Sequence, residues 1–277
     1  MGSLVAALAS YLDARSNNGT WLMRMEDLDP PRESLEAADQ ILFALDALGL
    51  HWDGAVLYQS QRYAAYREAI GTLRNRDMVF ACDCTRQQVM ENDGVYPGTC
   101  RHRQLEDEEG RALRCRVADS TITFVDTIQG RQQQNLGQEV GDFVIRRKDA
   151  LFAYQLAVVV DDGFQQVNHV VRGIDLLDST PRQIYLQQLL GLPRPVYSHI
   201  PVIVNAAGQK LSKQHFAAPI DARKPSSLLF EALCYLQQAP EQGLVDADPA
   251  DILAWGCAHW QPDRLLGLES LQESLPA

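Results

Sequence analysis

The 277-residue sequence contains no apolar run near the roughly 20 residues that a membrane-spanning helix needs. Its apolar start, residues 1–9, lacks the basic beginning of a secretion signal and is predicted to be the body of a helix. Six cysteines are present, but their uneven clustering is not typical of a disulfide framework. With no internal repeats either, the sequence predicts a soluble, monomeric protein of the reducing cytoplasm.

The sequence also lacks an excess of positive charge. Its net charge of -11 argues against general affinity for nucleic acid, because neutralising phosphates requires clustered lysine and arginine. Two basic runs, Arg101-His102-Arg103 and Arg146-Arg147-Lys148, could still form a local basic face. Either run alone is more typical of ordinary solvated charge.

Changes of pattern along the chain predict an α/β protein. Residues 1–80 have the spacing of helix, strand, helix and helix, and we expect them to form the first half of a catalytic core. Residues 81–150 are polar, with short strands such as "TITFVD" and "DFVIRR", and are predicted to be an inserted metal-binding domain. Residues 151–221 return to a strand and helix rhythm and complete the core, and residues 222–277 form a small helical region.

A cluster of cysteines lies in "CDCTRQQVMENDGVYPGTC", residues 82–100. Cys82 and Cys84 can chelate a metal from one tight turn, and Cys100 can close a loop back onto them. Zinc favours tetrahedral ligation by sulfur and nitrogen, so the pattern indicates a metal site rather than idle thiols. The candidates for the fourth ligand are Asp83, Asp93, Tyr96, His102 and Asp142. His102 is the generic choice, whereas the turn "YPGTC" would deliver Tyr96 together with Cys100.

Two segments carry groups suited to an amino acid. "RMEDLDPPR" places Glu26, Asp27 and Asp29 at the end of a strand, where ligands bind in open α/β sheets, although Asp29 before two prolines is equally typical of a turn. A carboxylate there could hold an amine. Arg172 follows another apolar strand and is suited to bidentate binding of a carboxylate. Tyr154, inside "FAYQLAVVV", fits either a site or the core.

A third segment, "GQKLSKQ" at residues 208–214, suits polyphosphate. Lys210 and Lys213 lie three residues apart on a loop that begins with glycine. Ammonium groups on such a loop can follow charge that develops on a transferring phosphorus. Lysine-rich surface loops are common, so this motif on its own is weak.

In their order, the segments "GSLVAAL", "RMEDLDPPR", "FAYQLAVVVDD", "VVRGIDLLDSTPRQ" and "KLSKQ" resemble the catalytic core of the glutamyl class I aminoacyl-tRNA synthetases over nearly the whole chain. "KLSKQ" stands where that family has its KMSKS signature. The CxC…YxGxC pattern resembles that of the family's short glutamyl-Q paralogues, whose zinc is held by three cysteines and a tyrosine. The resemblance therefore implies one structural zinc on Cys82, Cys84, Tyr96 and Cys100.

The resemblance also implies an activity and a Rossmann-like core. It implies a ligase that activates L-glutamate with ATP, accompanied by Mg²⁺, and attaches it to queuosine at the first anticodon position of tRNA(Asp). Glu26 would bind the α-amino group of glutamate, and Tyr154 and Arg172 would complete the amino-acid pocket. The residues implied to contact ATP are Gly2, Ser3, Lys210 and Lys213, with Lys213 stabilising the α-phosphate as the adenylate forms.

The resemblance is incomplete at the N-terminus. Of a PSPxGxLHxGS-type signature only Gly2 and Ser3 are present, and the first strand, an arginine and the histidine or histidines of the HIGH element are missing. Two explanations are open: the true start lies upstream, or the gene product is shortened. We expect the 277-residue chain to be unstable or nearly inactive, and upstream residues to restore glutamate activation. The alternatives are an inactive paralogue that binds tRNA and a fragment of a glutamyl-tRNA synthetase; the cysteine cluster and the short segment after "KLSKQ" count against the fragment.

Overall fold

A computed structural model describes residues 1–29, 35–205, 208 and 223–272. The described α-helices are α1 (Gly2–Ser16), α2 (Leu35–Ala47), α3 (Tyr63–Asn75), α4 (Arg86–Met90), α5 (Leu136–Glu139), α6 (Tyr154–Gln165), α7 (Thr180–Leu190), α8 (Pro225–Tyr235) and α9 (Pro249–His259). The described strands are β1 (Arg24–Met25), β2 (Leu57–Tyr58), β3 (Val79–Cys82), β4 (Ala112–Cys115), β5 (Thr121–Asp126), β6 (Gly130–Asn135), β7 (Phe143–Arg146), β8 (His169–Gly173), β9 (Val196–Ile200), β10 (Val202–Val204) and β11 (Ser270–Gln272). No helix in these ranges is long and apolar enough to span a membrane.

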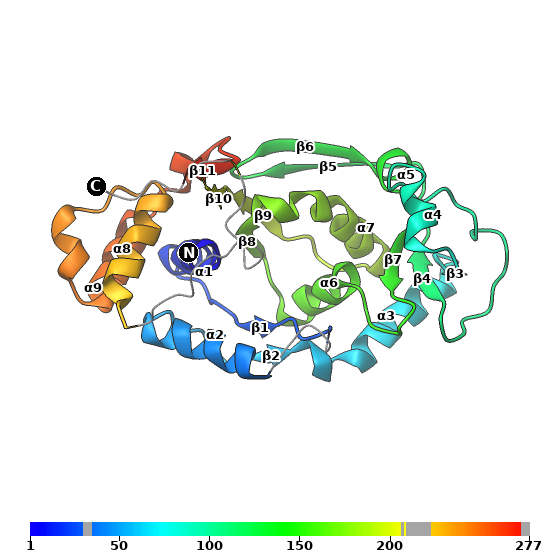
Figure 1. The fold of residues 1–277 in the computed structure, drawn as a ribbon, viewed down its shortest axis with the longest axis horizontal. Coiled ribbons are helices and arrows are strands. Elements are labelled where there is room, and N and C mark those ends of the chain that lie inside the picture. Colours follow the sequence, from blue (N-terminus) through cyan, green and yellow to red (C-terminus); the bar gives the residue numbers. More distant parts are fainter. Residues whose placement is uncertain (30–34, 206–207, 209–222, 273–277) are drawn as a thin grey trace.

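The central sheet has the strand order β6-β5-β9-β8. The β8–β9 and β5–β9 pairs are parallel, whereas β5 and β6 form an antiparallel hairpin along one side of the molecule (Figure 1). The predicted strand "TITFVD" is β5, and its residues alternate between exposed and buried as expected of a strand with one covered face. The parallel strands bring the carboxyl ends of β8 and β9 to the same edge.

Helices bury the sheet in two apolar cores. Helices α3, α6 and α7 pack on one another, and α7 packs on β5. Helix α1 packs on β8 and also contacts α8 and α9, which form the end of the molecule opposite to β3 and β4 (Figure 1). The predicted helical C-terminal region thus contributes to a core that includes the N-terminal helix.

The apolar run "FAYQLAVVVDD" supplies helix α6 rather than a strand. An apolar run of this length fits a strand or a buried helix on pattern alone, and burial on several sides of α6 explains its uniformly apolar composition. The helical period places Tyr154, at the start of α6, on the same face as Asp161 two turns later. A tyrosine and a buried carboxylate therefore face the same region.

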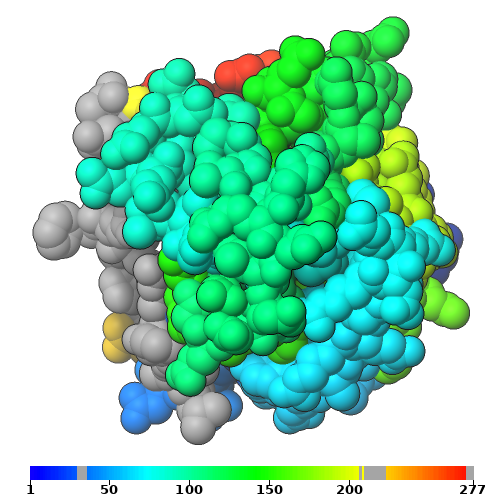
Figure 2. All heavy atoms as spheres, turned by 90° about the vertical axis from the view of Figure 1, so that its right-hand side faces the viewer, coloured from blue at the N-terminus to red at the C-terminus, as the bar shows by residue number. Residues whose placement is uncertain are grey.

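A second, antiparallel sheet of order β3-β4-β7 carries the cysteine cluster. Figure 2 views the molecule from this end, where residues of α3 and of the segment around this sheet form the surface. The hairpin β5–β6 lies between β4 and β7 in sequence but pairs with β9 instead. The predicted limits of the four domains stay a prediction, and residues 121–135 extend the central sheet.

Candidate active site and metal centre

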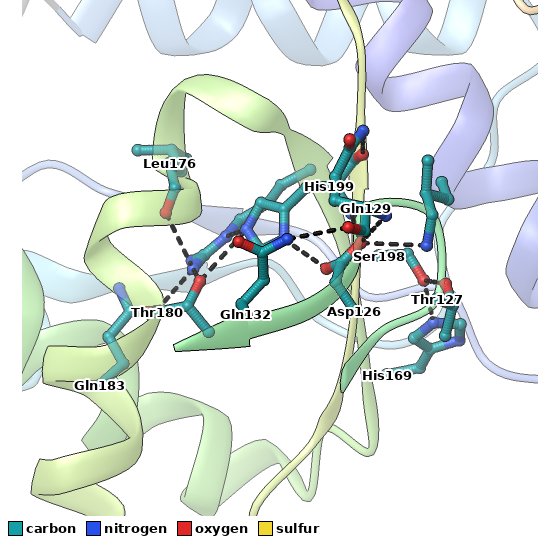
Figure 3. A network of polar contacts seen from close by, with 12 residues as sticks. Asp126, Thr127, Gln129, Gln132, His169, Leu176, Thr180, Gln183, Ser198 and His199 are labelled. Atoms are coloured by element: carbon teal, nitrogen blue, oxygen red, sulfur yellow. Dashed lines mark hydrogen bonds and ion pairs between the residues drawn. The ribbon is translucent and has the colours of Figure 1, made fainter. Parts of the chain in front are cut away.

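Arg172 lies near the carboxyl end of β8, opposite His199 of β9. Each of its three guanidinium nitrogens donates at least one hydrogen bond. Nε donates to His199 Nε2 (3.0 Å), and Nη1 donates to Tyr154 Oη (3.1 Å). Nη2 donates to Thr180 Oγ1 and Gln183 Oε1, both at 2.8 Å (Figure 3). The structure thus brings together the two residues, Tyr154 and Arg172, that the sequence assigned to one pocket.

Glu26 differs from the other two carboxylates of "RMEDLDPPR". Asp27 accepts hydrogen bonds from the backbone N–H (2.9 Å) and the hydroxyl (2.5 Å) of Ser60, and Asp29 binds Arg147 at 3.1 Å. Among the described residues, Glu26 has no hydrogen-bond partner, and its side chain reaches solvent. Of the three predicted carboxylates, Glu26 is the one with a free binding face.

The electrostatics connect Glu26 to the same pocket. Although part of the Glu26 side chain is exposed, the protein packed around its carboxyl reduces the hydration of the charged form and raises the pKa of Glu26, and the charges of Arg24 and Arg172 oppose that shift. Burial likewise raises the pKa of Tyr154, which keeps the phenol neutral, and Glu26 adds to this shift. The charges of Glu26 and Arg172 therefore act on each other and on Tyr154, which places a carboxylate within the electrostatic influence of the Tyr154–Arg172 pair.

Two buried acidic residues of α6 were not identified from the sequence. Asp161 accepts hydrogen bonds from Gln59 (2.9 Å), Arg62 (2.9 Å) and Tyr66 (2.6 Å), which tie α6 to α3 and the segment before it. Asp162 pairs with Arg24 at 2.5 Å. The signal available in the sequence was a pair of acidic residues inside an apolar helix, since buried carboxylates require partners.

Arg24 carries N–H groups that are not used within the described part of the chain. Its Nε and Nη1 are buried without a hydrogen-bond partner among the described residues. Buried donors of this kind are costly unless something accepts from them. A bound carboxylate or phosphate would supply that acceptor, so the pocket as built fits an anionic ligand.

The predicted ATP contacts are only partly described. Gly2 and Ser3 are the first two residues of α1, the helix that packs on β8. The first backbone N–H groups of a helix lack partners within it, which suits an anion. Lys210 and Lys213 lie outside the described residues.

The predicted basic runs are neutralised within the molecule. The ion pairs are Arg101 with Asp142, Arg103 with Asp83, Arg146 with Asp107, and Arg147 with Asp29 and Asp149. Lys148 donates to the backbone carbonyl of Asp83. These runs support the interpretation as ordinary structural and surface charge.

The three clustered cysteines meet at the end of β3. The Sγ atoms of Cys82, Cys84 and Cys100 all lie within 4.8 Å of one another. Tyr96 Oη lies 3.5 Å from Cys82 Sγ and 3.9 Å from Cys84 Sγ, and the backbone N–H of Cys100 donates to it at 2.8 Å. His102 is exposed and is not part of the group of metal-binding side chains found in the described ranges.

These separations fit one zinc ion. Zinc–thiolate bonds of about 2.3 Å in a tetrahedron hold two sulfurs roughly 3.8 Å apart. Cys84 Sγ and Cys100 Sγ are 3.5 Å apart, and the distances to the tyrosine oxygen are in the same range. The donor set of three sulfurs and one oxygen around a common centre is suited to a closed, four-coordinate site.

Two residues that the sequence did not reveal surround this centre. Arg114 on β4 is buried, donates from Nε to Cys82 Sγ (3.2 Å) and lies 3.9 Å above the Tyr96 ring. Burial opposes ionisation of Cys82, but the hydrogen bonds from Tyr96 and Arg114 outweigh it and lower the pKa of that thiol. Gly141, with φ of +69°, leaves space that the Tyr96 backbone fills: a Cβ there would lie 2.5 Å from the Tyr96 carbonyl oxygen.

Comparison with known proteins shows which family the chain belongs to. Residues 1–224 match the family model described as tRNA synthetases class I (E and Q), catalytic domain. A solved glutamate tRNA ligase from Elizabethkingia meningosepticum has the same fold, with a TM-score of 0.80 at 21% identity over 99% of this chain and 64% of that chain. This chain thus spans less than two thirds of that ligase.

Relatives named "Glutamyl-Q tRNA(Asp) synthetase" match over nearly all of the chain. The protein of that name from Ectopseudomonas mendocina is 51% identical over 273 residues, covering 99% of this chain and 92% of the relative. The one from Thiobacillus denitrificans is 53% identical over 271 residues, covering 96% and 90%. The chain therefore has the class I synthetase fold and belongs to the glutamyl-Q tRNA(Asp) synthetase family of ligases.

Proposed function

We propose that the protein activates L-glutamate with ATP and transfers it to queuosine at the first anticodon position of tRNA(Asp). The observation that carries this proposal is the group of Glu26, Tyr154 and Arg172, in which a carboxylate without a hydrogen-bond partner among the described residues interacts electrostatically with a fixed guanidinium. The names of relatives that are 51–53% identical over at least 89% of their length support the substrate and the acceptor.

The pocket is complementary to an amino acid with two carboxylates. The Glu26 carboxylate binds the α-ammonium group, which also favours the charged form of a carboxyl whose pKa is raised. Arg172 and the Tyr154 hydroxyl bind a carboxylate of the substrate. The spare donors of Arg24 supply positive charge to the same region and help to hold the substrate anion.

In the activation step, an α-carboxylate oxygen of glutamate attacks the α-phosphorus of ATP. A new P–O bond forms, the bond to the leaving pyrophosphate breaks, and Mg²⁺ accompanies the nucleotide. Lys213 stabilises the charge that develops at the α-phosphate, and Gly2, Ser3 and Lys210 contact ATP. In the transfer step, a nucleophilic group of queuosine attacks the acyl carbon and AMP leaves.

Zinc has a structural role in this proposal. Cys82, Cys84, Tyr96 and Cys100 would hold it, and it would supply a cross-link for the module built on β3 and β4 rather than a reacting group. Metal analysis should find one zinc per chain, and Cys82→Ala should lose it and unfold the module earlier, because structural zinc contributes directly to folding.

The decisive experiment measures ATP–pyrophosphate exchange with glutamate, followed by transfer of labelled glutamate to tRNA(Asp) with and without queuosine. In the family's complete enzyme, Arg172→Ala should abolish the glutamate-dependent exchange, a loss on the order of 2–5 kcal/mol, because a substrate carboxylate is left unpaired. Arg194→Ala, which changes an exposed arginine, is the matched control and should keep wild-type exchange. Exchange without glutamate dependence, or equal transfer to tRNA lacking queuosine, would refute the proposal.

A further inference from the structure

A buried chain of hydrogen bonds leads from the central sheet to Arg172. It begins at Asp126, the last residue of β5, which is 1% exposed. Asp126 Oδ1 accepts three backbone N–H groups: those of Ile128 (3.0 Å), Gln129 (2.8 Å) and His199 (3.1 Å). Asp126 Oδ2 contacts His199 Nδ1 at 2.6 Å (Figure 3). The carboxylate is thus anchored through one oxygen and faces the imidazole with the other.

This arrangement fixes the tautomer of His199. A carboxylate can only accept, so the Nδ1 of His199 carries the hydrogen and the Nε2 keeps its lone pair. That lone pair accepts from Arg172 Nε at 3.0 Å, and Thr180 Oγ1 lies 3.2 Å from the same nitrogen. The side chains of His199 and Asp126 are fully buried, so this contact is shielded from solvent. The opposite tautomer would point an N–H at the Arg172 N–H.

Counting the donors of Arg172 shows what the chain leaves for a ligand. A guanidinium has five N–H groups. One is used by His199 and one on Nη1 by Tyr154. The two on Nη2 are shared by Thr180 and Gln183, both at 2.8 Å, and by the carbonyl of Leu176 at 3.4 Å. Among the described residues, the second N–H of Nη1 has no acceptor. Because Tyr154 Oη accepts from Arg172, its own O–H can donate to a ligand.

We propose that Asp126 and His199 are positioning residues for recognition of a substrate carboxylate, acting through the direction of these hydrogen bonds. Asp126 sets the His199 tautomer. The His199 lone pair then accepts from Arg172 Nε and fixes the orientation of the guanidinium. The remaining Nη1 N–H of Arg172 and the Tyr154 O–H then form a two-donor clamp. This inference rests on the proposed function for the identity of the carboxylate as that of glutamate.

Asp126→Asn tests the direction without changing the shape. Three backbone N–H groups demand an acceptor at the position of Oδ1, so the amide nitrogen of asparagine must face His199. The amide would donate to His199 Nδ1, so the ring hydrogen would move to Nε2. The Nε2–H would then face the N–H of Arg172 Nε and could no longer accept from it. We expect ¹⁵N NMR of the histidine rings to report the Nδ1–H tautomer for His199 in the wild type and the Nε2–H tautomer in Asp126→Asn.

Glutamate binding, measured by calorimetry on the same chain, gives the second readout. Asp126→Asn and His199→Leu should weaken binding about 10- to 100-fold, as for loss of a charged hydrogen bond. His199→Gln, whose side-chain oxygen can accept from Arg172, should restore most of the affinity. Ser198→Ala removes a neighbouring buried hydroxyl that contacts Thr127 and His169 instead, and should bind like the wild type.

The outcomes separate this inference from the proposed function. A wild-type His199 in the Nε2–H tautomer, or unchanged glutamate affinity in Asp126→Asn with a reversed tautomer, overturns the positioning role. Equal losses in His199→Gln and His199→Leu do the same. A wild-type chain with the expected tautomer that binds no glutamate refutes the assigned substrate instead.

Discussion

Gly141→Ala should damage the metal centre by moving Tyr96. Gly141 has φ of +69°, and a Cβ at this position would lie 2.5 Å from the Tyr96 carbonyl oxygen and 2.9 Å from its nitrogen. Both contacts are with backbone, so the segment that carries the tyrosine must shift. Because Tyr96 N donates to the carbonyl of Val140 at 3.2 Å, the shift displaces the residue that offers its oxygen to the cluster.

Gly130→Ala is the matched control. Gly130 has φ of +71°, but a Cβ there meets nothing within 4 Å. Left-handed backbone costs an alanine roughly 1–2 kcal/mol at either position. The steric overlap at Gly141 adds about 1–3 kcal/mol, as for overpacking. We therefore expect Gly141→Ala to lower the free energy of unfolding by about 1–3 kcal/mol more than Gly130→Ala.

Urea unfolding of zinc-loaded protein measures this difference, and competition with a chromogenic chelator measures zinc affinity. Gly141→Ala should release zinc to the chelator at least about tenfold more readily, which corresponds to about 1.4 kcal/mol. Gly130→Ala should hold zinc like the wild type. Equal destabilisation by the two substitutions, or unchanged zinc affinity in Gly141→Ala, would show that Tyr96 is not held by the contact described here.

Three further predictions concern Arg114, Glu26 and His199. Arg114→Met should lower zinc affinity about 10- to 100-fold, as for loss of a residue that orients metal ligands, while Arg116→Met, which removes a cation over Phe80, should not. Glu26→Gln should raise the KM for glutamate at least about tenfold with little change in the KM for ATP, and equal changes in both would contradict its role. The third prediction concerns pH. Burial lowers the pKa of His199 in the folded protein, so on acidification the unfolded chain binds a proton at this residue before the folded chain does. The free energy of unfolding therefore falls as the pH drops below the pKa of about 6.5 that the histidine has in the unfolded chain. Between pH 7.5 and 5.5 this loss is at most about 1.4 kcal/mol, and urea unfolding of His199→Gln should lack that part of the pH dependence.

The sequence by itself determined the features that depend only on residues adjacent in the chain. The alternation in "TITFVD" predicted β5, and the turn chemistry of "YPGTC" predicted that Tyr96 and Cys100 are delivered together. The strand ends at Glu26 and Arg172 were recognisable because an apolar run followed by a polar residue marks the edge where ligands bind. Such signals depend on a few adjacent residues, so they survive without knowledge of the fold.

The tertiary structure decided which of these candidates has a free binding face. Asp27 and Asp29 are equivalent to Glu26 in sequence, but Ser60 and Arg147 occupy them and leave Glu26 open. Whether "FAYQLAVVVDD" is a strand or a helix depended on burial against α3 and α7, which no local pattern encodes. The contacts that occupy Asp27 and Asp29 join residues 33 and 118 positions apart in the sequence.

The same reason explains why the surroundings of both sites were missed. Arg114 contacts Cys82 although the two residues are 32 positions apart in the sequence, and Asp126 contacts His199 although they are 73 positions apart. Spacing within a motif identifies the atoms that can bind a metal or a carboxylate. The direction of each hydrogen bond, and with it the tautomer of His199 and the free donors of Arg172, is set by parallel pairing of β5, β8 and β9, because only the folded sheet brings these side chains within reach of one another.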